Sequence, residues 1–343
     1  MLVARLLGAH ELVVGDEPAP VPGPDDALVR VAAVGLCGSD THWWETAGIG
    51  DTRLDRGLVL GHEIAGTIVE DGRVTPVVVD PSQPCGTCPT CTAGSEDLCP
   101  SARFAGFGET DGGLREWMAW PRRLLVPVPA GLDPAEACQL EALGVALRAV
   151  ERGGVGPSTR VAVVGTGPIG LLVVRACRAR GATAVLATDR LSHRVEAARI
   201  SGATAAWLAE DDAVHADTHP VDVALECAGT NAAFDTAIRL VRPGGHVVVV
   251  GIPEDDRIAF SASTARRKGL TVSFSRRMRA ADLHDAAALV GDGRVSLDGL
   301  VTLEADLADA ADAFEVQAAR TGVKVVVRTQ SYDRIPDARL PRW

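Results

Sequence analysis

The first part of the chain, up to about residue 143, alternates short apolar runs rich in β-branched residues with segments rich in proline and glycine. Two of the latter, PAPVPGPDD and DPSQPCGTCP, have the composition of turns and loops. Because short strands at close spacing are separated by such turns, this part predicts a compact β-rich domain. The apolar runs that predict its strands include Leu28–Val34, Ile64–Val69, Val77–Val79 and Leu124–Val128.

The middle of the chain shows a second pattern, in which apolar runs of strand length alternate with segments of helix length. Such alternation is typical of a doubly wound sheet of parallel strands with helices on both faces. The segment RPGG predicts a turn before the last of these strands. The predicted strands are Arg160–Val164, Ala184–Thr188, Val221–Glu226 and His246–Val250, and the predicted helices are Leu171–Ala179, Arg190–Ser201 and Asn231–Val241.

The pattern changes again towards the C-terminus. Two helices are predicted there, Asp282–Val290 and Ala305–Ala318, and the strand Val323–Arg328 follows the second. We expect this strand to rejoin the β-rich domain. The predicted fold class is therefore α/β, with a doubly wound domain of residues 144–276 inserted into a β-rich domain made from residues 1–143 and 277–343.

Composition and charge exclude several classes of protein. The chain has 343 residues, enough for two domains, and its 34 Lys and Arg against 45 Asp and Glu give a net charge of −11. This balance argues against a sequence-independent nucleic-acid binder, which needs a basic face. The longest uncharged apolar run, residues 161–174, is shorter than the roughly 20 residues of a membrane span. The N-terminal residues lack a signal-peptide layout, so we expect a cytoplasmic protein. Only Lys268 and Lys324 are lysines, which we interpret as coding bias.

Four of the 8 cysteines crowd into one short segment, at Cys85, Cys88, Cys91 and Cys99. Such spacings let four thiolates of one loop wrap a single zinc ion, and the neighbouring prolines and glycines supply the turns. A site with four cysteine ligands is closed, so this zinc is expected to hold structure and not to take part in chemistry. An iron–sulfur cluster is the competing interpretation, because proline follows Cys99, but the long gap before Cys99 fits a cluster less well.

A second metal site is predicted from residues that lie farther apart. Cys37 lies in the segment GLCGSDTH and His62 in the segment GHE. A catalytic zinc takes three protein ligands and keeps a further position open. The third ligand is either Glu141 or Glu63, and the residues alone leave that choice open. Asp40 is a candidate to accept the second ring proton of His62, which fixes the tautomer of a ligating histidine.

A glycine-rich loop, GTGPIG, follows the first predicted strand of the doubly wound domain and opens a helix. Its glycines allow a tight turn and let backbone NH groups approach a pyrophosphate at the helix N-terminus. Asp189, at the end of the next strand, is placed to bind both ribose hydroxyls and to repel a 2′-phosphate. This favours NAD over NADP, although the cation of Arg190 softens the discrimination. The candidate cofactor-binding residues are Gly165, Gly167, Pro168, Ile169, Gly170, Asp189, Arg190 and Arg194.

Together these motifs resemble the zinc-dependent medium-chain dehydrogenase/reductase (alcohol dehydrogenase) family, and the resemblance covers essentially the whole chain. Within the family, the sequence looks most similar to the polyol branch of sorbitol, xylitol and L-idonate dehydrogenases. The stretch CQLEALGVALRAVERGGV is also similar to 2-deoxy-scyllo-inosamine dehydrogenase, which oxidises an aminocyclitol. The matching stretches are GLCGSDTHWW, VLGHEIAGTIVE, VDPSQPCGTCPTC, CQLEALGVALRAV, VAVVGTGPIGLL and LVRPGGHVVVVG.

The resemblance implies a fold and a set of roles. It implies a GroES-like catalytic domain that holds both zinc ions, together with a Rossmann domain that binds NAD. It implies that Cys37 and His62 bind the catalytic zinc. It also implies a glutamate as third ligand at the position that Glu141 matches, with Glu63 able to approach or exchange. Ser39 and His42 are implied to carry the proton away from the alcohol, and a homodimer or homotetramer is a further implication.

Some positions depart from the family pattern. Ala142 follows Glu141 where the branch usually has proline, so the helix start is less fixed. The loop DGRVTPVVV is shorter than usual. The branch usually has an aromatic residue at the position of Trp43, and here the side chain is aromatic but is a larger indole. Arg277 matches an arginine that faces the substrate in this branch, with Arg276 as the alternative. Trp43 and Arg277 are therefore the candidate substrate residues.

The expected function is the reversible oxidation of a secondary alcohol on a polyol, aldonate or cyclitol to the ketone. The metal is expected to lower the pKa of the hydroxyl as a Lewis acid, and NAD to accept the hydride. Alternatives are an L-threonine 3-dehydrogenase, an aminocyclitol dehydrogenase of secondary metabolism and a non-enzymatic family member recruited as a binding or structural protein. The remaining cysteines, Cys138, Cys177 and Cys227, are interpreted as small buried hydrophobes.

Overall fold

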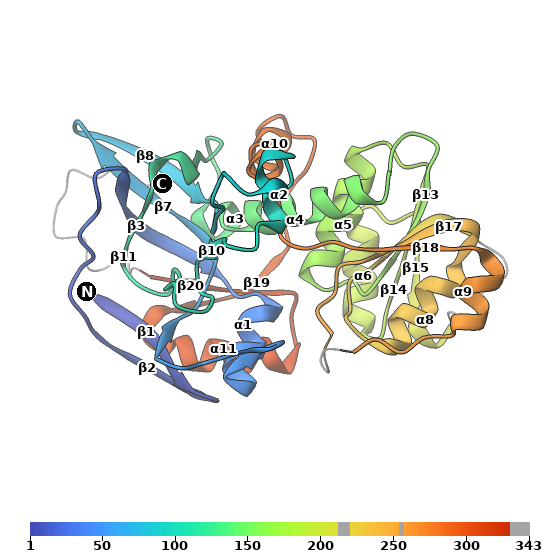
Figure 1. Cartoon of the computed structure of the whole chain (residues 1–343), viewed down its shortest axis with the longest axis horizontal. Coiled ribbons are helices and arrows are strands. Elements are labelled where there is room, and N and C mark those ends of the chain that lie inside the picture. Colours follow the sequence, from blue (N-terminus) through green and yellow to red (C-terminus); the bar gives the residue numbers. More distant parts are fainter. Residues whose placement is uncertain (212–219, 254–256, 330–343) are drawn as a thin grey trace. The chain divides into compact units, whose positions relative to one another are not determined.

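The computed structural model describes residues 1–211, 220–253 and 257–329. The chain folds into two compact units (Figure 1). The first, called the β-rich unit below, combines Met1–Glu141, Arg279–Asp292 and Leu297–Trp343, so both ends of the chain contribute to it. The second, called the parallel-sheet unit, consists of Ala142–Met278 and Gly293–Ser296. None of the helices in the described part of the chain has the length and hydropathy of a transmembrane segment.

A seven-stranded sheet forms the centre of the β-rich unit, with the strand order β12-β8-β7-β3-β20-β19 and with β11 also paired to β3. Strand β20 (Lys324–Arg328) pairs antiparallel with β3 (Asp26–Gly35), which confirms that the C-terminal strand rejoins this domain. The other strands of the sheet are β7 (Glu63–Glu70), β8 (Arg73–Val79), β11 (Trp117–Pro121), β12 (Leu125–Pro127) and β19 (Val301–Asp306).

Smaller elements complete the β-rich unit. Helix α1 (Gly38–Thr46) follows β3 directly, and α4 (Gln139–Arg152) starts within this unit. The remaining strands are β1 (Leu2–Gly8), β2 (Glu11–Asp16), β4 (Gly48–Ile49), β5 (Thr52–Arg53), β6 (Leu58–Val59), β9 (Ser82–Gln83) and β10 (Arg103–Phe104), and the remaining helices are α2 (Pro89–Thr92), α3 (Pro134–Ala137), α10 (Ala280–Gly291) and α11 (Ala310–Ala319).

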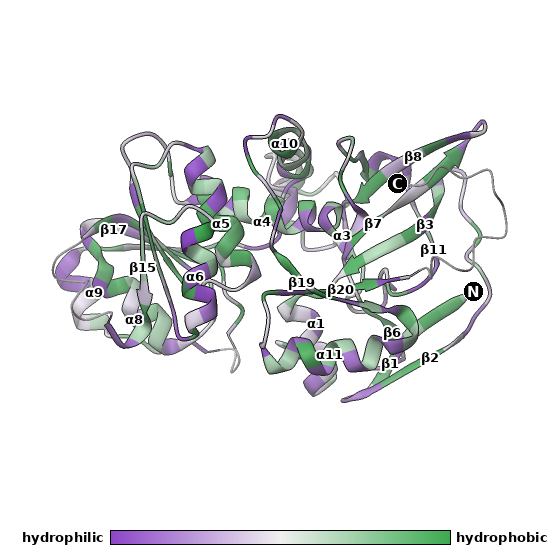
Figure 2. Cartoon of the chain, turned by 180° about the vertical axis from the view of Figure 1, so that it is seen from behind, coloured by the Kyte–Doolittle hydropathy of each residue, from purple (hydrophilic) through white to green (hydrophobic). Residues whose placement is uncertain are grey.

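The core of the β-rich unit lies between its strands and α1 and α11. Buried and half-buried residues alternate along β3, as expected where one face of a sheet covers the core and the other lies nearer the solvent. Figure 2 shows the resulting green strands β1, β3 and β7, whereas α11 carries both green and purple turns. The ring of Trp44 on α1 stacks on Phe314 of α11 at a centroid distance of 6.0 Å. This contact joins the two helices that close the core.

The parallel-sheet unit contains six parallel strands in the order β15-β14-β13-β16-β17-β18. In order of sequence within this unit the arrangement is 3-2-1-4-5-6, which is the Rossmann order and confirms the predicted fold class. Its central strands β13, β14 and β16 are largely apolar and buried, as expected for parallel strands covered by helices. The strands are β13 (Arg160–Val164), β14 (Ala184–Asp189), β15 (Ala205–Leu208), β16 (Val221–Glu226), β17 (Val241–Val249) and β18 (Thr271–Phe274), and the helices are α5 (Pro168–Ala179), α6 (Ser192–Ile200), α8 (Asn231–Leu240) and α9 (Ala262–Lys268).

Three local predictions were wrong. The segment RPGG is part of β17 and not a separate turn, with a register irregularity in the pairing of β17 to β16. Most of the segment 71–79 is strand β8, because a tight Asp-Gly turn folds it back on β7 as a hairpin. The helix predicted at Ala305 begins at Ala310, because the residues before it pair with β20 as β19.

Candidate functional site

A single buried carboxylate ties the segment that carries Cys37 to the segment that carries His62. Asp40 stands in the first turn of α1, and its Oδ2 accepts a hydrogen bond from the backbone NH of Cys37 at 2.9 Å. Its Oδ1 accepts a hydrogen bond from the backbone NH of Gly61 at 3.2 Å. Because Asp40 is only 1% exposed, water competes little for these bonds. The two segments are therefore held side by side.

The imidazole of His62 is oriented by the same carboxylate. Its Nδ1 lies 3.4 Å from Oδ1 of Asp40, and its ring lies 5.3 Å from that of Phe104 between centroids. This arrangement leaves Nε2 as the ring nitrogen available to a metal, as in carboxylate–histidine–metal triads. Burial lowers the pKa of His62, but Asp40 and the Cys37 thiol outweigh it and raise this pKa well above its ordinary value. A bound metal therefore has to displace a proton here.

The side chain of Glu63 is engaged through one oxygen. Its Oε1 accepts a hydrogen bond from Nζ of Lys324 at 2.6 Å, and both side chains are 1% exposed. Its Oε2 is buried and has no hydrogen-bond partner among the described residues. Burial lowers the pKa of Lys324, but Glu63 and Cys37 hold it above its ordinary value, so the ammonium is charged. Lys324 was missed by the sequence analysis.

Gly35 makes room for this ion pair. Glu63 lies on β7 and Lys324 on β20, and both strands pair with β3, which lies between them. Gly35 of β3 is directly opposite Glu63. A Cβ atom at Gly35 would lie 2.2 Å from Oε2 of Glu63 and 3.0 Å from Cε of Lys324. The two side chains therefore meet across a central strand at the one position where that strand has no side chain.

Glu141 is the second glutamate of the predicted site, and its situation is different. It lies in the first turn of α4, is 4% exposed, and has no hydrogen bond or ion pair with other described residues. Burial, with Glu63 and Asp80 nearby, raises the pKa of Glu141 to about 8, although His62 and Lys324 lower it. An unpartnered buried carboxylate is costly, and a nearby cation relieves that cost.

The donor atoms of this cluster fit a zinc ion. The thiol of Cys37, a ring nitrogen of His62 and a carboxylate oxygen of Glu63 lie within 4.8 Å of one another. Thiolate, imidazole and carboxylate together are a donor set that zinc accepts at open sites. Glu141 lies outside this group of three, but it is the carboxylate whose charge no other described side chain compensates by direct contact.

The four clustered cysteines also come together, as the spacing predicted. Their sulfur atoms all lie within 4.8 Å of one another, with 3.4 Å between Cys88 and Cys91 and 3.6 Å between Cys85 and Cys99. These separations are much longer than the roughly 2.05 Å of a disulfide bond. They are close to the about 3.8 Å that tetrahedral zinc imposes when each Zn–S bond is about 2.3 Å. The cluster therefore fits a closed zinc site.

Local backbone geometry prepares this loop for thiolates. Helix α2 starts at Pro89 directly after Cys88, and the NH of Cys88 points back to Sγ of Cys85 at 3.4 Å. Hydrogen bonds from Thr87 and Cys88 lower the pKa of Cys85 to about 6, whereas desolvation and the neighbouring Cys88 raise the pKa of Cys91 to about 12. A lowered thiol pKa favours the deprotonated form that binds metal.

The dinucleotide loop has the expected geometry in the parallel-sheet unit. It joins the end of β13 to α5, whose first residue is Pro168 and whose N-cap is Gly167. A Cβ atom at Gly170 would lie 1.9 Å from the carbonyl oxygen of Gly165, so this close turn requires glycine. The backbone NH groups at the start of α5 are thereby available to an anion.

Asp189 lies beside this loop at the end of β14. Its Oδ2 accepts a hydrogen bond from the NH of Thr166 at 2.7 Å, and its Oδ1 accepts one from the NH of Leu191 at 3.0 Å. Arg194 lies against the loop, since a Cβ atom at Gly167 would be 3.4 Å from one of its guanidinium nitrogens. Arg190 is exposed. The structure therefore brings the acid and one of the two arginines to the glycine loop.

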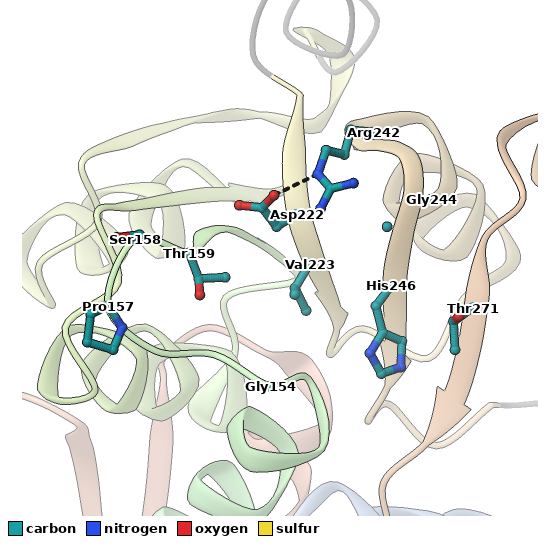
Figure 3. Close-up of a pocket in the computed structure, with 11 residues that line it drawn as sticks. Gly154, Pro157, Ser158, Thr159, Asp222, Val223, Arg242, Gly244, His246 and Thr271 are labelled. Carbon is teal, nitrogen blue, oxygen red and sulfur yellow. Dashed lines mark hydrogen bonds and ion pairs between the residues drawn. The ribbon is translucent and has the colours of Figure 1, made fainter.

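An open cavity of about 400 Å³ lies elsewhere in the parallel-sheet unit (Figure 3). It is lined by residues at the amino ends of β13, β16, β17 and β18, and the ion pair between Arg242 and Asp222, at 2.7 Å, lies at its edge. In doubly wound sheets, ligands bind at the carboxyl ends of the strands. This cavity lies at the amino ends of the strands, whereas the glycine loop lies at their carboxyl ends, so we do not assign the cofactor to the cavity.

The other predicted residues are placed as follows. Ser39 and His42 lie on α1 one helical turn apart, and both are half-buried. Trp43 is 1% exposed and its ring meets that of Phe107 at 5.7 Å, so it is a core residue of the β-rich unit. Arg277 follows β18 and adopts a φ of 55°. The roles of Trp43 and Arg277 towards a substrate stay predictions.

Comparison with known proteins identifies the family. The model of the alcohol dehydrogenase GroES-like domain matches residues 23–130, and that of the zinc-binding dehydrogenase matches residues 168–292. D-xylulose reductase A of Aspergillus niger is 32% identical over 340 residues, which cover 94% of this chain and 95% of that protein. The chain belongs to the zinc-dependent medium-chain dehydrogenase family. It is therefore an enzyme, an alcohol dehydrogenase that uses zinc and a nicotinamide nucleotide.

Solved structures place this medium-chain dehydrogenase in the polyol branch. L-idonate 5-dehydrogenase from Escherichia coli superposes with a TM-score of 0.88 at 25% identity, covering 95% of this chain and 97% of that one. A zinc-binding dehydrogenase from Sinorhizobium meliloti 1021, bound to NADP, has a TM-score of 0.85 at 32% identity, covering 95% and 98%. Both the predicted family and the predicted branch are confirmed.

Proposed function

We propose that this polyol dehydrogenase oxidises a secondary alcohol of a polyol, aldonate or cyclitol to the ketone, reversibly, with NAD as hydride acceptor. The observation that carries the proposal is the group of Cys37, His62 and Glu63, in which Asp40 orients His62 and near which Glu141 is buried. The relatives support the substrate class by their names, since xylulose is a ketose and idonate is a sugar acid. Two carboxylates near the metal give a polar site, which suits a hydroxyl-rich substrate.

We propose Glu141 as the third ligand of the catalytic zinc, with Glu63, whose carboxylate lies within 4.8 Å of the donor atoms of Cys37 and His62, as the alternative. The carboxylate of Glu63 already has the ammonium of Lys324 at 2.6 Å, whereas that of Glu141 has no such partner among the described residues. The pKa of Glu141 is raised to about 8 mainly by burial, which outweighs the lowering by His62 and Lys324. A divalent cation between Cys37 and His62 supplies a compensating charge.

The chain's own residues then have distinct tasks. The zinc, when bound, polarises the substrate oxygen, and the nicotinamide takes up the hydride. Asp40 keeps His62 in the tautomer that ligates through Nε2. Ser39 accepts the proton of the substrate hydroxyl, and His42, one turn along α1, passes it to the solvent. The half-buried position of both side chains supports this route.

We further propose NAD in place of NADP, and a second zinc at the four cysteines. The buried carboxylate of Asp189 beside the glycine loop disfavours the negative charge of a 2′-phosphate. Two observations favour NADP instead: Arg190 is exposed, and the relative from Sinorhizobium meliloti was solved with NADP bound. Equal catalytic efficiency with NADP would therefore overturn the cofactor assignment without touching the metal site.

A homodimer or homotetramer is the proposed assembly. Strand β18 is the outer strand of the parallel sheet, and its Val272 and Phe274 are 36% and 61% exposed. An apolar edge strand of this kind is suited to pairing with a second copy of the chain. A monomer in light scattering at micromolar concentration would contradict this assembly. The cytoplasmic location stays a prediction.

The experiment that tests the function is oxidation of a substrate panel by the purified enzyme. The panel contains polyols, aldonates, cyclitols, aminocyclitols and L-threonine, each with NAD and with NADP. We expect turnover with at least one hydroxyl-rich secondary alcohol and a higher kcat/KM with NAD. Turnover confined to L-threonine would support the sister activity, and no turnover by protein that carries both zinc ions would overturn the proposal.

A further inference from the structure

We propose that Glu226 is a positioning residue of the dinucleotide site, whose carboxylate fixes residues 227–230, called the β16 loop below, as the wall that faces the nicotinamide half of the cofactor. The inference rests on the proposed function, because it takes the glycine loop as the place where a nicotinamide nucleotide binds. It adds to that loop a buried acid at the end of β16 that the metal chemistry does not use.

The topology of the parallel sheet places Glu226 where a dinucleotide binds. Dinucleotides lie across the carboxyl ends of the strands, at the point where the strand order reverses. In this sheet that point lies between β13 and β16, which are neighbours although β14 and β15 separate them in sequence. Glu226, the last residue of β16, is paired with Val164, the residue before the glycine loop. Because Asp189 on β14 is on the side that binds the adenosine ribose, the β16 loop lies on the side of the nicotinamide.

The hydrogen bonds of Glu226 hold two loops at this edge of the sheet. Its Oε1 accepts one from the backbone NH of Ala228 and one from the backbone NH of Gly229, each at 2.8 Å. Its backbone carbonyl accepts two more, from the NH of Val250 at 2.8 Å and from the NH of Gly251 at 2.9 Å. One residue therefore joins the β16 loop to the segment that follows β17.

The backbones of these loops pack against one another without room for side chains. A Cβ atom at Gly165 of the glycine loop would lie 2.7 Å from Cβ of Ala228. A Cβ atom at Gly229 would lie 2.2 Å from the carbonyl oxygen of Ile252, and one at Gly251 would lie 2.2 Å from the backbone nitrogen of Gly229. A shift of the β16 loop therefore has to displace the glycine loop or the segment after β17.

The burial of Glu226 indicates that its hydrogen bonds are the reason for an acid at this position. The residue is 1% exposed, and it has an ion pair with none of the described residues. Burial raises the pKa of Glu226, although the NH groups of Gly229, Ala228 and Thr230 lower it. Burying a carboxyl group is costly, and here the gain is a β16 loop held in one place at the dinucleotide site.

The test separates the two halves of the cofactor in the full-length protein. AMP probes the adenosine half and NADH the whole cofactor, and titration calorimetry measures the affinity for each. In Glu226→Ala two buried NH groups lose their acceptor, so we expect NADH to bind about tenfold more weakly, with the affinity for AMP unchanged. Glu226→Gln keeps an oxygen that can accept both hydrogen bonds and should bind NADH within about threefold of the unmodified protein. Glu196→Ala, which removes an exposed glutamate of α6, is the matched control and should change neither affinity.

Hydrogen exchange of the protein without cofactor gives a second readout. The amides of the β16 loop should exchange faster in Glu226→Ala than in the unmodified protein, while those of α6 stay the same. If Glu226→Ala does not fold, Glu226→Asp, whose carboxylate is one methylene shorter, should show both effects in a milder form.

The proposal would be overturned by unchanged NADH affinity in a folded Glu226→Ala or, where that variant does not fold, in Glu226→Asp. It would also be overturned if Glu226→Gln bound NADH as weakly as Glu226→Ala, because the charge and not the hydrogen bonds would then matter. Failure of the unmodified protein to bind NADH would instead overturn the proposed function.

Discussion

The two proposed metal sites of the β-rich unit are built in opposite ways. The four-cysteine site comes from one continuous loop, its ligands are all of one kind, and three of the four are partly or fully exposed. The open site brings Cys37, from the segment before α1, together with His62 and Glu63, from the start of β7, and these residues are held by Asp40 and Lys324, both 1% exposed. A local closed site can serve stability, whereas a buried site made of mixed donors can keep a position free for chemistry.

This contrast leads to the largest expected effect. Cys37→Ser should lower kcat by roughly a thousandfold or more, because it weakens the binding of a metal ion that stabilises the transition state by several kcal/mol. Elemental analysis should show the zinc content fall from two per chain to one. The apparent melting temperature of the protein should change little. Full turnover together with two zinc ions per chain would rule out Cys37 as a ligand.

The converse substitution tests the closed site. Cys88→Ser removes a ligand from the loop, where metal binding contributes directly to folding. We expect a loss of a few kcal/mol, or about 5–10 °C in the apparent melting temperature measured by scanning calorimetry. Turnover per folded molecule at low temperature should be retained. If Cys88→Ser instead abolished turnover without lowering the melting temperature, the four-cysteine site would serve catalysis and not stability.

A smaller effect is expected from the residue that connects the segments of the open site. Asp40→Asn keeps the shape of the side chain but removes the charge that orients His62. Zinc affinity at the open site should fall about 10- to 100-fold, as for other partners of ligating histidines. Competition with a chromophoric chelator measures this affinity, and the four-cysteine site provides the reference. An unchanged affinity would show that Asp40 serves the fold alone.

The smallest effect is predicted outside both sites. Asp111 receives two hydrogen bonds from Arg5, at 3.0 and 3.1 Å. Burial raises the pKa of Asp111, but Arg5 and the backbone NH of Val59 outweigh it and hold this pKa below its ordinary value. A depressed carboxyl pKa contributes stability that is present above the unfolded value, about 4, and is lost as pH falls through the folded value.

Asp111→Asn should therefore be less stable by about 1 kcal/mol at pH 7, the scale of a partly exposed ion pair. Its deficit relative to the unmodified protein should shrink as the pH falls below about 4. Denaturant titrations of both proteins across pH measure the difference. Turnover and zinc content at pH 7 should be unchanged, and a change in either would mean that the Arg5 contact communicates with a metal site.

The same contrast explains what could be predicted from the sequence. The four cysteines and the glycine loop are local, so their spacing alone indicated a metal site and a dinucleotide loop, and the geometry agrees. The parallel strands were predictable because burial on both faces makes them continuous apolar runs. Cys37 and His62 were predicted as ligands of one zinc, with Asp40 as the partner of the His62 ring, but the hydrogen bonds by which Asp40 joins the two segments were not predicted.

The features that escaped prediction depend on long-range pairing. Lys324 was set aside as coding bias, although a lysine that starts the apolar run KVVVR was a signal for a buried ion pair. Its partner Glu63 becomes apparent only when β20 and β7 are seen on either side of β3. The start of helix α11 was misplaced for the same reason, since pairing of β19 with β20 overrides the local helical pattern.

One chain is expected to hold a structural and a catalytic zinc, and turnover is expected to depend on the open site. Release of zinc to a chromophoric chelator, followed in parallel with turnover on the same sample, tests it most directly. We expect zinc release in two phases of one zinc per chain each, loss of turnover with the faster phase, and recovery of turnover when zinc is added back. A single zinc per chain, or turnover that survives the faster phase and falls only with the slower one, would contradict it.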